Sequence, residues 1–160
     1  MPVSADELRQ AMRQWTTGVT IVTSRAEGIQ HGMTVNSFTS ISLDPPLVAV
    51  TLANHTRTHA LVARSGVFAV TILSQLQAEL ADRFAGRIPE DGDRFHGLAT
   101  FPLSSGAPLL ADGLAWLDCR VVATHPLAES TLFLGEVDAS RVIPDGEPLV
   151  YHSRIYRRLA

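Results

Sequence analysis

The sequence predicts a mainly β domain, an antiparallel barrel with helices packed against its outside. Three observations support this prediction. About seven short segments are rich in apolar or β-branched residues, against two or three segments with helical periodicity. Successive strand-like segments are linked by short turns, and two of the links contain helices. The 160 residues, 46% of them apolar, are enough for one domain with a sizeable core, which we expect to span residues 1–160.

The composition argues against several classes of protein. Charged residues make up 18% of the chain and its formal net charge is −3, which gives no reason to expect a nucleic-acid partner. The longest apolar runs are only strand-sized, and the first ten residues lack the pattern of a signal peptide, so we expect a cytoplasmic protein without membrane contact. The single cysteine, Cys119, lies in a strand-like run and is predicted to be a small core residue.

The N-terminal segment predicts an amphipathic helix. Ser4 and Glu7 have the spacing of a capping box, and Gly18 is placed to end the helix. Its apolar face consists of Leu8, Ala11, Met12 and Trp15. A short strand, Val19–Thr23, follows, and a turn at residues 25–28 predicts a hairpin with the next segment.

The stretch from residue 31 to residue 50 is unusual for a strand. It places six small polar side chains in nine residues: Thr34, Asn36, Ser37, Thr39, Ser40 and Ser42. Its first apolar residues, Val35, Phe38 and Ile41, are three apart, which indicates a bulge or widened turn. Such a segment suits a flat heteroaromatic ligand, and the alternative is an edge strand whose polar face meets water. After Pro45 and Pro46 we expect a new strand, Leu47–Leu52, buried on both sides.

Residues 53–59 predict a polar loop that leads into a short helix over residues 60–64, before Gly66. Asn54 and Thr56 are both suitable N-caps. The first-turn amides, the guanidinium of Arg57 and the hydroxyl of Thr58 would form a site for a phosphate. The alternative is a capped surface helix with an exposed arginine.

The rest of the chain predicts four further strands, one helix and a long loop. Strand Val67–Leu73 precedes a capping box of Ser74 and Gln77, which begins a helix with Leu76, Leu80 and Phe84 on one stripe before Gly86. Residues 87–112 form an irregular loop of the kind that often covers a site. Strand 114–125 pairs with strand 131–142, and a last strand spans residues 149–156.

Several familiar sites are missing from the sequence. It has neither the G-x-G-x-x-G of a Rossmann dinucleotide site nor a phosphate-binding P-loop, and no G-x-S-x-G nucleophile. His55 and His59 are four apart, but no H-E-x-x-H or cysteine pair supports a metal site, so we expect no metal.

Six motifs, in this order, resemble the flavin reductase family, the small NAD(P)H:flavin oxidoreductases that serve two-component monooxygenases. They are W-T-T-G-V-T-I-V-T from Trp15, H-G-M-T-V-N-S-F-T-S-I-S-L-D-P-P from His31, R-T-H-A from Arg57, D-R-F-A-G from Asp82, G-D-R-F from Gly92 and Y-H-S-R-I-Y-R from Tyr151. The resemblance runs from about residue 8 to residue 158.

This resemblance implies a split antiparallel β-barrel of the FMN-binding type, with Greek-key-like connections. It also implies a homodimer that reduces FMN or FAD with NADH or NADPH and passes the reduced flavin to a separate monooxygenase. Hydride transfer between the cofactors needs no catalytic acid or base from the protein, which agrees with a chain rich in hydroxyls and amides but without a catalytic dyad.

The resemblance also assigns residues. Those for the isoalloxazine and ribityl are Thr34, Val35, Asn36 and Ser37, with Ser40 or Ser42 nearby. Those for the phosphate are Asn54, Arg57 and Thr58, and Arg83 and Phe84 border the flavin. The nicotinamide side has His152, Arg154 and Tyr156, with His125 as a further candidate.

Two other functions fit the same barrel. One is a flavoprotein that carries FMN, or holds it permanently, and barely reacts with NAD(P)H. The other is an oxidase of a small amine such as a pyridoxine phosphate, for which more basic residues are expected around the pocket.

Overall fold

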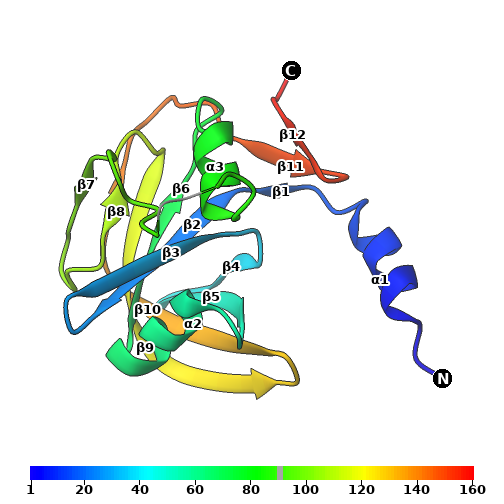
Figure 1. The fold of residues 1–160 in the computed structure, drawn as a ribbon, viewed down its shortest axis with the longest axis horizontal. Coiled ribbons are helices and arrows are strands. Elements are labelled where there is room, and N and C mark those ends of the chain that lie inside the picture. Colours follow the sequence, from blue (N-terminus) through cyan, green and yellow to red (C-terminus); the bar gives the residue numbers. More distant parts are fainter. Residues whose placement is uncertain (90–91) are drawn as a thin grey trace.

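A seven-stranded antiparallel sheet dominates the computed structural model, which describes residues 1–89 and 92–160 (Figure 1). The strand order is β3-β2-β6-β9-β10-β5-β4. The strands are β2 (Thr20–Ala26), β3 (Ile29–Val35), β4 (Phe38–Leu43), β5 (Pro46–Ala53), β6 (Val67–Ile72), β9 (Ala115–Leu127) and β10 (Ser130–Val142). The prediction of a mainly β, antiparallel fold with flanking helices is confirmed.

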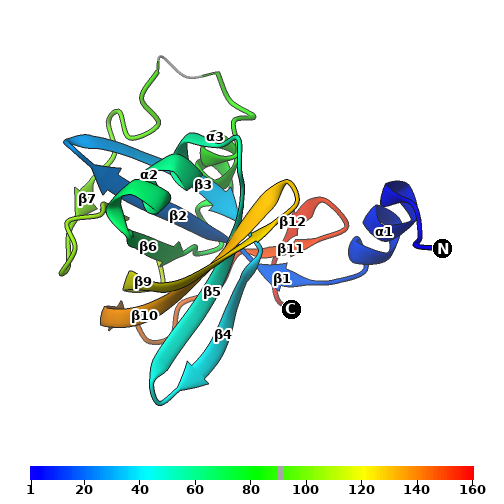
Figure 2. The same ribbon diagram turned by 90° about the horizontal axis from the view of Figure 1, so that it is seen from below.

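The two edges of this sheet, β3 and β4, are consecutive in the chain. Only Asn36 and Ser37 separate them, and in Figure 2 the curled sheet brings β3 and β4 together at this connection, from which the two strands run apart. The strand pairings among the described residues leave the sheet open between β3 and β4. The polar stretch singled out in the sequence is therefore the point where the curled sheet comes closest to closing.

Local chemistry explains the hairpins. The β2–β3 turn has Glu27 and Gly28 at φ 53° and 80°, which matches the twist of the flanking strands. The pairing of β4 with β5 shifts register between Ser40 and Ser42, which confirms the predicted bulge. Pro46 is the first residue of β5, where its missing N–H costs no central ladder bond.

The main core lies inside the curled sheet. Its largest fully buried side chains include Phe68 and Phe133, packed with Val22, Val50 and Leu52. A Cβ at Gly135 would lie 2.6 Å from the ring of Phe68, so β10 needs glycine where it crosses this ring. A second core, around Phe84 and Leu110, lies under α3 and the long loop.

The first two helices differ from their predicted bounds. Helix α1 (Ala5–Met12) has the predicted Ser4–Glu7 capping box, but it ends at Met12, and Gly18 belongs instead to the short strand β1 (Thr17–Gly18). Helix α2 (Arg57–Ser65) begins three residues earlier than expected, because the Thr56 hydroxyl accepts a hydrogen bond from the His59 N–H. Gly66 ends α2 at φ 72°, as predicted.

The prediction for the third helix is partly wrong. Helix α3 (Ala78–Phe84) begins later, and only half of the expected capping box forms, with the Ser74 N–H donating to the side-chain oxygen of Gln77. Leu76 lies before the helix and is exposed, so it is not part of the apolar stripe. Phe84 is fully buried, as that stripe requires.

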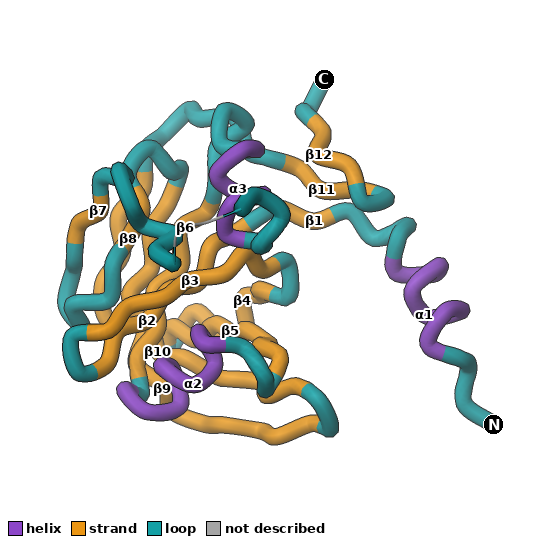
Figure 3. The backbone as a smooth tube through the Cα atoms, viewed as in Figure 1, coloured by secondary structure: helices purple, strands orange, loops and turns teal. Residues whose placement is uncertain are grey.

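The C-terminal segment is a hairpin rather than the single predicted strand. Strands β11 (Val150–His152) and β12 (Ile155–Arg157) are joined by Ser153 and Arg154, whose φ angles of 51° and 64° reverse the chain (Figure 3). The hairpin pairs with β1 in a three-stranded sheet, and α1 projects from this end of the molecule (Figure 1).

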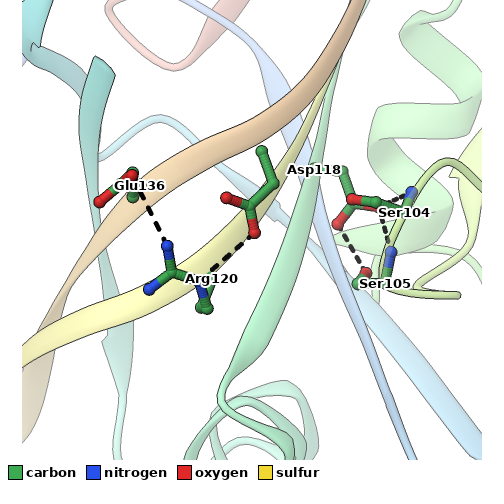
Figure 4. Close-up of polar contacts among 6 residues, drawn as sticks. Ser104, Ser105, Asp118, Arg120 and Glu136 are labelled. Carbon is green, nitrogen blue, oxygen red and sulfur yellow. Dashed lines mark hydrogen bonds and ion pairs between the residues drawn. The ribbon is translucent and has the colours of Figure 1, made fainter. Parts of the chain in front are cut away.

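The predicted loop of residues 87–112, of which 90–91 lie outside the described residues, contains two short paired strands, β7 (Thr100–Phe101) and β8 (Leu109–Leu110). A buried carboxylate holds it to the body. Asp118 on β9 accepts hydrogen bonds from the N–H groups of Ser104 and Ser105, both at 2.8 Å, and from the Ser105 hydroxyl at 2.6 Å (Figure 4).

Cys119 is buried in the core, as predicted, and burial raises the pKa of its thiol to about 12. We expect the native protein to be unreactive toward a disulfide reagent at pH 8, because the thiolate is the nucleophile. The unfolded chain should react at once. Rapid reaction of the native protein with the reagent would contradict this prediction.

The buried thiol also predicts a pH dependence of stability. The unfolding free energy should fall as pH rises from 9 toward 12, because the unfolded thiol loses its proton first.

Candidate functional site

Four adjoining cavities form a groove along the end of β3 and the start of β4. We call them cavities A, B, C and D, with volumes of about 410, 180, 590 and 200 Å³. Thr34 lines both A and B, and Asn36 lines B, C and D. The polar stretch predicted to bind a ligand is therefore the wall that these cavities share.

Cavity A lies between β3, the N-terminus of α2 and the end of α3. Arg57, in the first turn of α2, is exposed and lines it together with Arg94 from the long loop. Arg94 Nη1 donates to the carbonyls of Gly32 and Phe84, at 3.0 and 3.1 Å. A helix N-terminus with two guanidinium groups beside it favours an anion such as a phosphate.

Two of the predicted phosphate residues support this cavity instead of lining it. Thr58 is fully buried, and its hydroxyl lies 2.8 Å from Nδ1 of His31, which does line the cavity. Asn54 Oδ1 accepts from the Thr131 hydroxyl at 2.6 Å, and its Nδ2 donates to the Ala128 carbonyl. Because Thr131 donates to Asn54, it must accept from His59 Nε2, 3.0 Å away. These bonds hold in place the start of α2, where Arg57 lies.

Cavity B lies between the β3 end, α3 and the C-terminal hairpin. Tyr156 donates to Asp82 Oδ1 at 3.1 Å, and Arg87 pairs with the same oxygen at 3.0 Å while its guanidinium lies 6.0 Å from the Tyr156 ring centroid. Burial, followed by the hydrogen bond to Asp82, raises the pKa of Tyr156 to about 12, so it remains a neutral donor. The aromatic wall of this cavity consists of Tyr151 and Tyr156.

Cavity C, the largest of the four, combines apolar rings with small polar groups. Trp15 and Phe38 line it beside Asn36, Ser37 and Thr17. The Thr17 hydroxyl is buried and has no hydrogen-bond partner among the described residues. Burying a hydroxyl without a partner is unfavourable, so this atom points to a ligand with a polar edge.

Replacement of Thr17 by valine gives the first prediction at the site. Without ligand, the unfolding free energy should rise by about 0.5–1 kcal/mol, because an unpaired buried hydroxyl is removed. Binding of a flavin, the ligand that the sequence resemblance implies, should weaken by about 1 kcal/mol, because valine offers it no hydrogen bond at this position. Chemical denaturation and flavin fluorescence titration measure the two changes. If Thr17→Val leaves flavin affinity unchanged, the hydroxyl is not a contact.

The structure places seven of the residues predicted from the sequence along the groove: Thr34, Asn36, Ser37, Arg57, Phe84, Arg154 and Tyr156.

The other eight predicted residues are not among the described lining residues of the four cavities. Val35 is a core residue, Ser40 and Ser42 lie further along β4, and His125 is exposed near the end of β9. Arg83 Nη2 donates to the His96 carbonyl, and His152 Nδ1 bonds the Thr16 hydroxyl. Asn54 and Thr58 support cavity A, as described above.

Sequence reasoning missed several lining residues. Trp15, His31, Arg94 and Tyr151 belong to the motifs quoted above but received no role, because a motif does not show which side chains face a cavity. Arg87 is the first residue of the irregular loop, where no sequence periodicity indicates which way a side chain points.

The charged side chains that line the groove are all of one type. Among the described lining residues, every aspartate, glutamate, lysine or arginine is an arginine: Arg57 and Arg94 in A, Arg87 in B, and Arg9, Arg13 and Arg154 in D. The chain as a whole has a net charge of −3. Arg9 and Arg87 pair with Asp6 and Asp82, but the lining contains no acidic side chain among the described residues, and this favours anionic ligands. Within the described residues, no group of three or more His, Cys, Asp or Glu side chains could hold a metal ion, and no helix could span a membrane.

The lining of the groove has the chemistry expected for a planar, phosphorylated ligand. Comparison with known proteins agrees with this class. The flavin reductase like domain matches residues 12–160, so the chain belongs to the flavin reductase family, a family of oxidoreductases. The resemblance stated from the sequence is confirmed.

Three relatives illustrate the family. An NADH-dependent flavin reductase of a Rhodococcus species is 39% identical over 155 residues, which cover 95% of this chain and 85% of that protein. The NADH:FAD oxidoreductase SgcE6 of Streptomyces globisporus C-1027, solved in complex with NAD and FAD fragments, has a TM-score of 0.90 at 33% identity, covering 100% and 97%. The styrene monooxygenase flavin reductase of Pseudomonas putida S12 has a TM-score of 0.84 at 35% identity, covering 95% and 96%.

Proposed function

We propose that this protein uses NADH to reduce a flavin bound in the groove and supplies the reduced flavin to a separate monooxygenase. The observation that carries the proposal is the pairing, in one continuous groove, of an arginine-only charged lining with a cavity of rings, amides and hydroxyls. Both flavin nucleotides and NADH are planar rings attached to phosphates. The relatives named above, which are flavin reductases and include the reductase of a styrene monooxygenase, support the same reading.

The residues of this chain then have distinct tasks. Arg57 and the first amides of α2 hold the flavin phosphate, and Thr34 lies on the path from cavity A to cavity B. Asn36, Ser37 and Thr17 face the polar edge of the ring. A bound flavin and NADH exchange hydride by their own chemistry, so the protein's part is to hold the two rings together and exclude water.

In this proposal the other assigned residues shape or support the walls of the groove. Val35, Ser40 and Ser42 shape the strands beside the ring, Asn54 and Thr58 fix the phosphate loop, and Arg83 and Phe84 border the flavin. We keep His152, Arg154 and Tyr156 on the nicotinamide side, because all three belong to the C-terminal hairpin beside cavities B and D. His125 stays a further candidate for the nicotinamide side.

We also propose that the fold is a split β-barrel, whose incomplete closure between β3 and β4 forms the groove, and that the reaction takes place in the cytoplasm. The adjacency of Asn36 and Ser37 to both sheet edges supports the first point. The free thiol of Cys119 agrees with a reducing compartment.

Titration of flavin against NADH consumption tests the function. Flavin-free protein should consume NADH at a rate that rises with added FMN or FAD and saturates, and NADPH tested in parallel gives the preference between donors. Tight flavin binding without NADH consumption would favour the carrier of FMN. Production of hydrogen peroxide from pyridoxamine phosphate alone would favour the amine oxidase.

We further propose a homodimer. Helix α1 has no buried residue, and large apolar side chains such as Leu8, Ile41, Leu43 and Val142 are exposed, with Leu43 at 89%. Such surface is commonly covered by a second subunit. Light scattering at micromolar concentration should give twice the chain mass of 17.3 kDa. A monomeric mass would overturn this proposal.

The amide of Asn36 provides a test of the ring contacts. Replacement of Asn36 by alanine should weaken FMN binding by about 1 kcal/mol, because one hydrogen bond to the ring is lost. The exposed position predicts almost no change in the unfolding free energy of the free protein. Fluorescence titration and chemical denaturation separate the two effects. Unchanged FMN affinity would remove Asn36 from the site.

A further inference from the structure

Cavity D is the part of the groove whose ligand is not explained by the flavin ring and its phosphate. It lies between the last turn of α1 and the turn of the C-terminal hairpin. Three arginines line it, and Arg9 also pairs with Asp6 at 2.6 Å. The arginines that can contact a ligand in this cavity are therefore Arg13 and Arg154.

Hydrogen bonds join the two walls of this cavity. The Ser153 N–H donates to the Arg13 carbonyl at 3.1 Å, and the Thr16 hydroxyl lies 2.8 Å from His152 Nδ1. The arm that carries α1 is thereby attached to the hairpin turn, and Arg13 and Arg154 are brought to one cavity.

The hairpin turn itself has an unusual residue. Arg154 has a φ of 64°, in the left-handed region that favours glycine or asparagine. An arginine there is accepted at a conformational cost, which is typical of positions where the side chain has a role in binding.

Cavity D also offers aromatic surface. Trp15 is 65% exposed at its edge, and Tyr151 is half-buried in its wall. Flat rings next to guanidinium groups suit a purine joined to phosphates, since the purine stacks and the phosphates pair with arginine. Tyr151 and Asn36 line both cavity D and cavity B, so a ligand bound in cavity D can extend into cavity B.

We propose that cavity D binds an adenosine diphosphate moiety, with Arg13 and Arg154 on the phosphates and Trp15 against the adenine. This inference rests on the proposed function, because NADH and FAD are the ligands that share this moiety. FMN lacks it and should not use the cavity.

Calorimetry with ADP itself provides the direct test. The parent protein should bind ADP, and Arg13→Met, Arg154→Met and the double variant should bind it at least tenfold more weakly, as loss of a charge-assisted hydrogen bond predicts. The affinity for FMN should stay within twofold. Arg64→Met is the matched control, because Arg64 lies at the far end of α2, paired with Glu27, and is not among the lining residues. No ADP binding by the parent, or equal binding by the variants, overturns the inference.

Two further arms identify which cofactor supplies the moiety. With FMN as the flavin, a raised KM for NADH in Arg13→Met, with no change for the phosphate-free donor 1-benzyl-1,4-dihydronicotinamide, assigns the cavity to NADH. Weaker binding of FAD without weaker binding of FMN assigns it to FAD. Either result supports the site, and unchanged values in both arms overturn it. If the parent binds ADP through these arginines but never oxidises NADH, the proposed function fails while the site stands.

Discussion

Replacement of Asp118 by alanine should lower the unfolding free energy by about 2–3 kcal/mol, and Tm by roughly 5–10 °C. Asp118 is fully buried and accepts two backbone N–H groups and a hydroxyl from Ser104 and Ser105. Without the carboxylate, these donors lose a charged acceptor, and the segment of the long loop that they hold is released from β9.

Asp138 provides the matched control for this result. Its carboxylate lies 3.5 Å from Arg120 Nε on the surface. Figure 4 shows Glu136 paired with the same guanidinium, at 3.6 Å. Because both partners are well exposed, Asp138→Ala should change stability by less than about 0.5 kcal/mol. Chemical denaturation of both variants measures the contrast. Equal stability of Asp118→Ala and the parent would show that the anchoring bonds are not formed.

Replacement of Arg57 by methionine should weaken FMN binding by about 2 kcal/mol, roughly thirtyfold. The reason is the loss of a charged donor to the phosphate at the N-terminus of α2. Arg64→Met, on the same helix but at its other end, should leave FMN affinity unchanged. Fluorescence titration gives both dissociation constants.

Riboflavin separates a phosphate contact from a general disturbance of the site. It lacks the phosphate, so Arg57→Met should bind it as well as the parent does. An equal loss of affinity for riboflavin and FMN would show that Arg57 acts on the shape of the groove. Unchanged FMN affinity would remove the phosphate assignment altogether.

The sequence predicted the strands well because their local signals agree. The two-residue turn before β3, the bulge at Ser40–Ser42 and the proline at the start of β5 are each set by residues within a few positions. Element ends were less predictable. Gly18 looked like a helix stop, but its place is decided by pairing with Val150, which no local pattern reveals.

The candidate site was predictable where one segment carries it, as with Thr34, Asn36 and Ser37. The direction in which each side chain points was not predictable. Asn54 and Thr58 have the right chemistry for a phosphate, yet tertiary partners in β10 and β3 engage their polar atoms. Arg87 and Arg94 come from a loop without periodicity, so only the folded structure brings them to the groove.

Mixing flavin-free protein with FMN and NADH in the absence of oxygen tests the central claim most directly. The flavin absorbance should bleach at a rate that saturates with NADH and depends on the amount of protein, and Arg57→Met should need more FMN to reach the same rate. FMN that binds to the protein but keeps its oxidised absorbance in the presence of NADH would contradict the account.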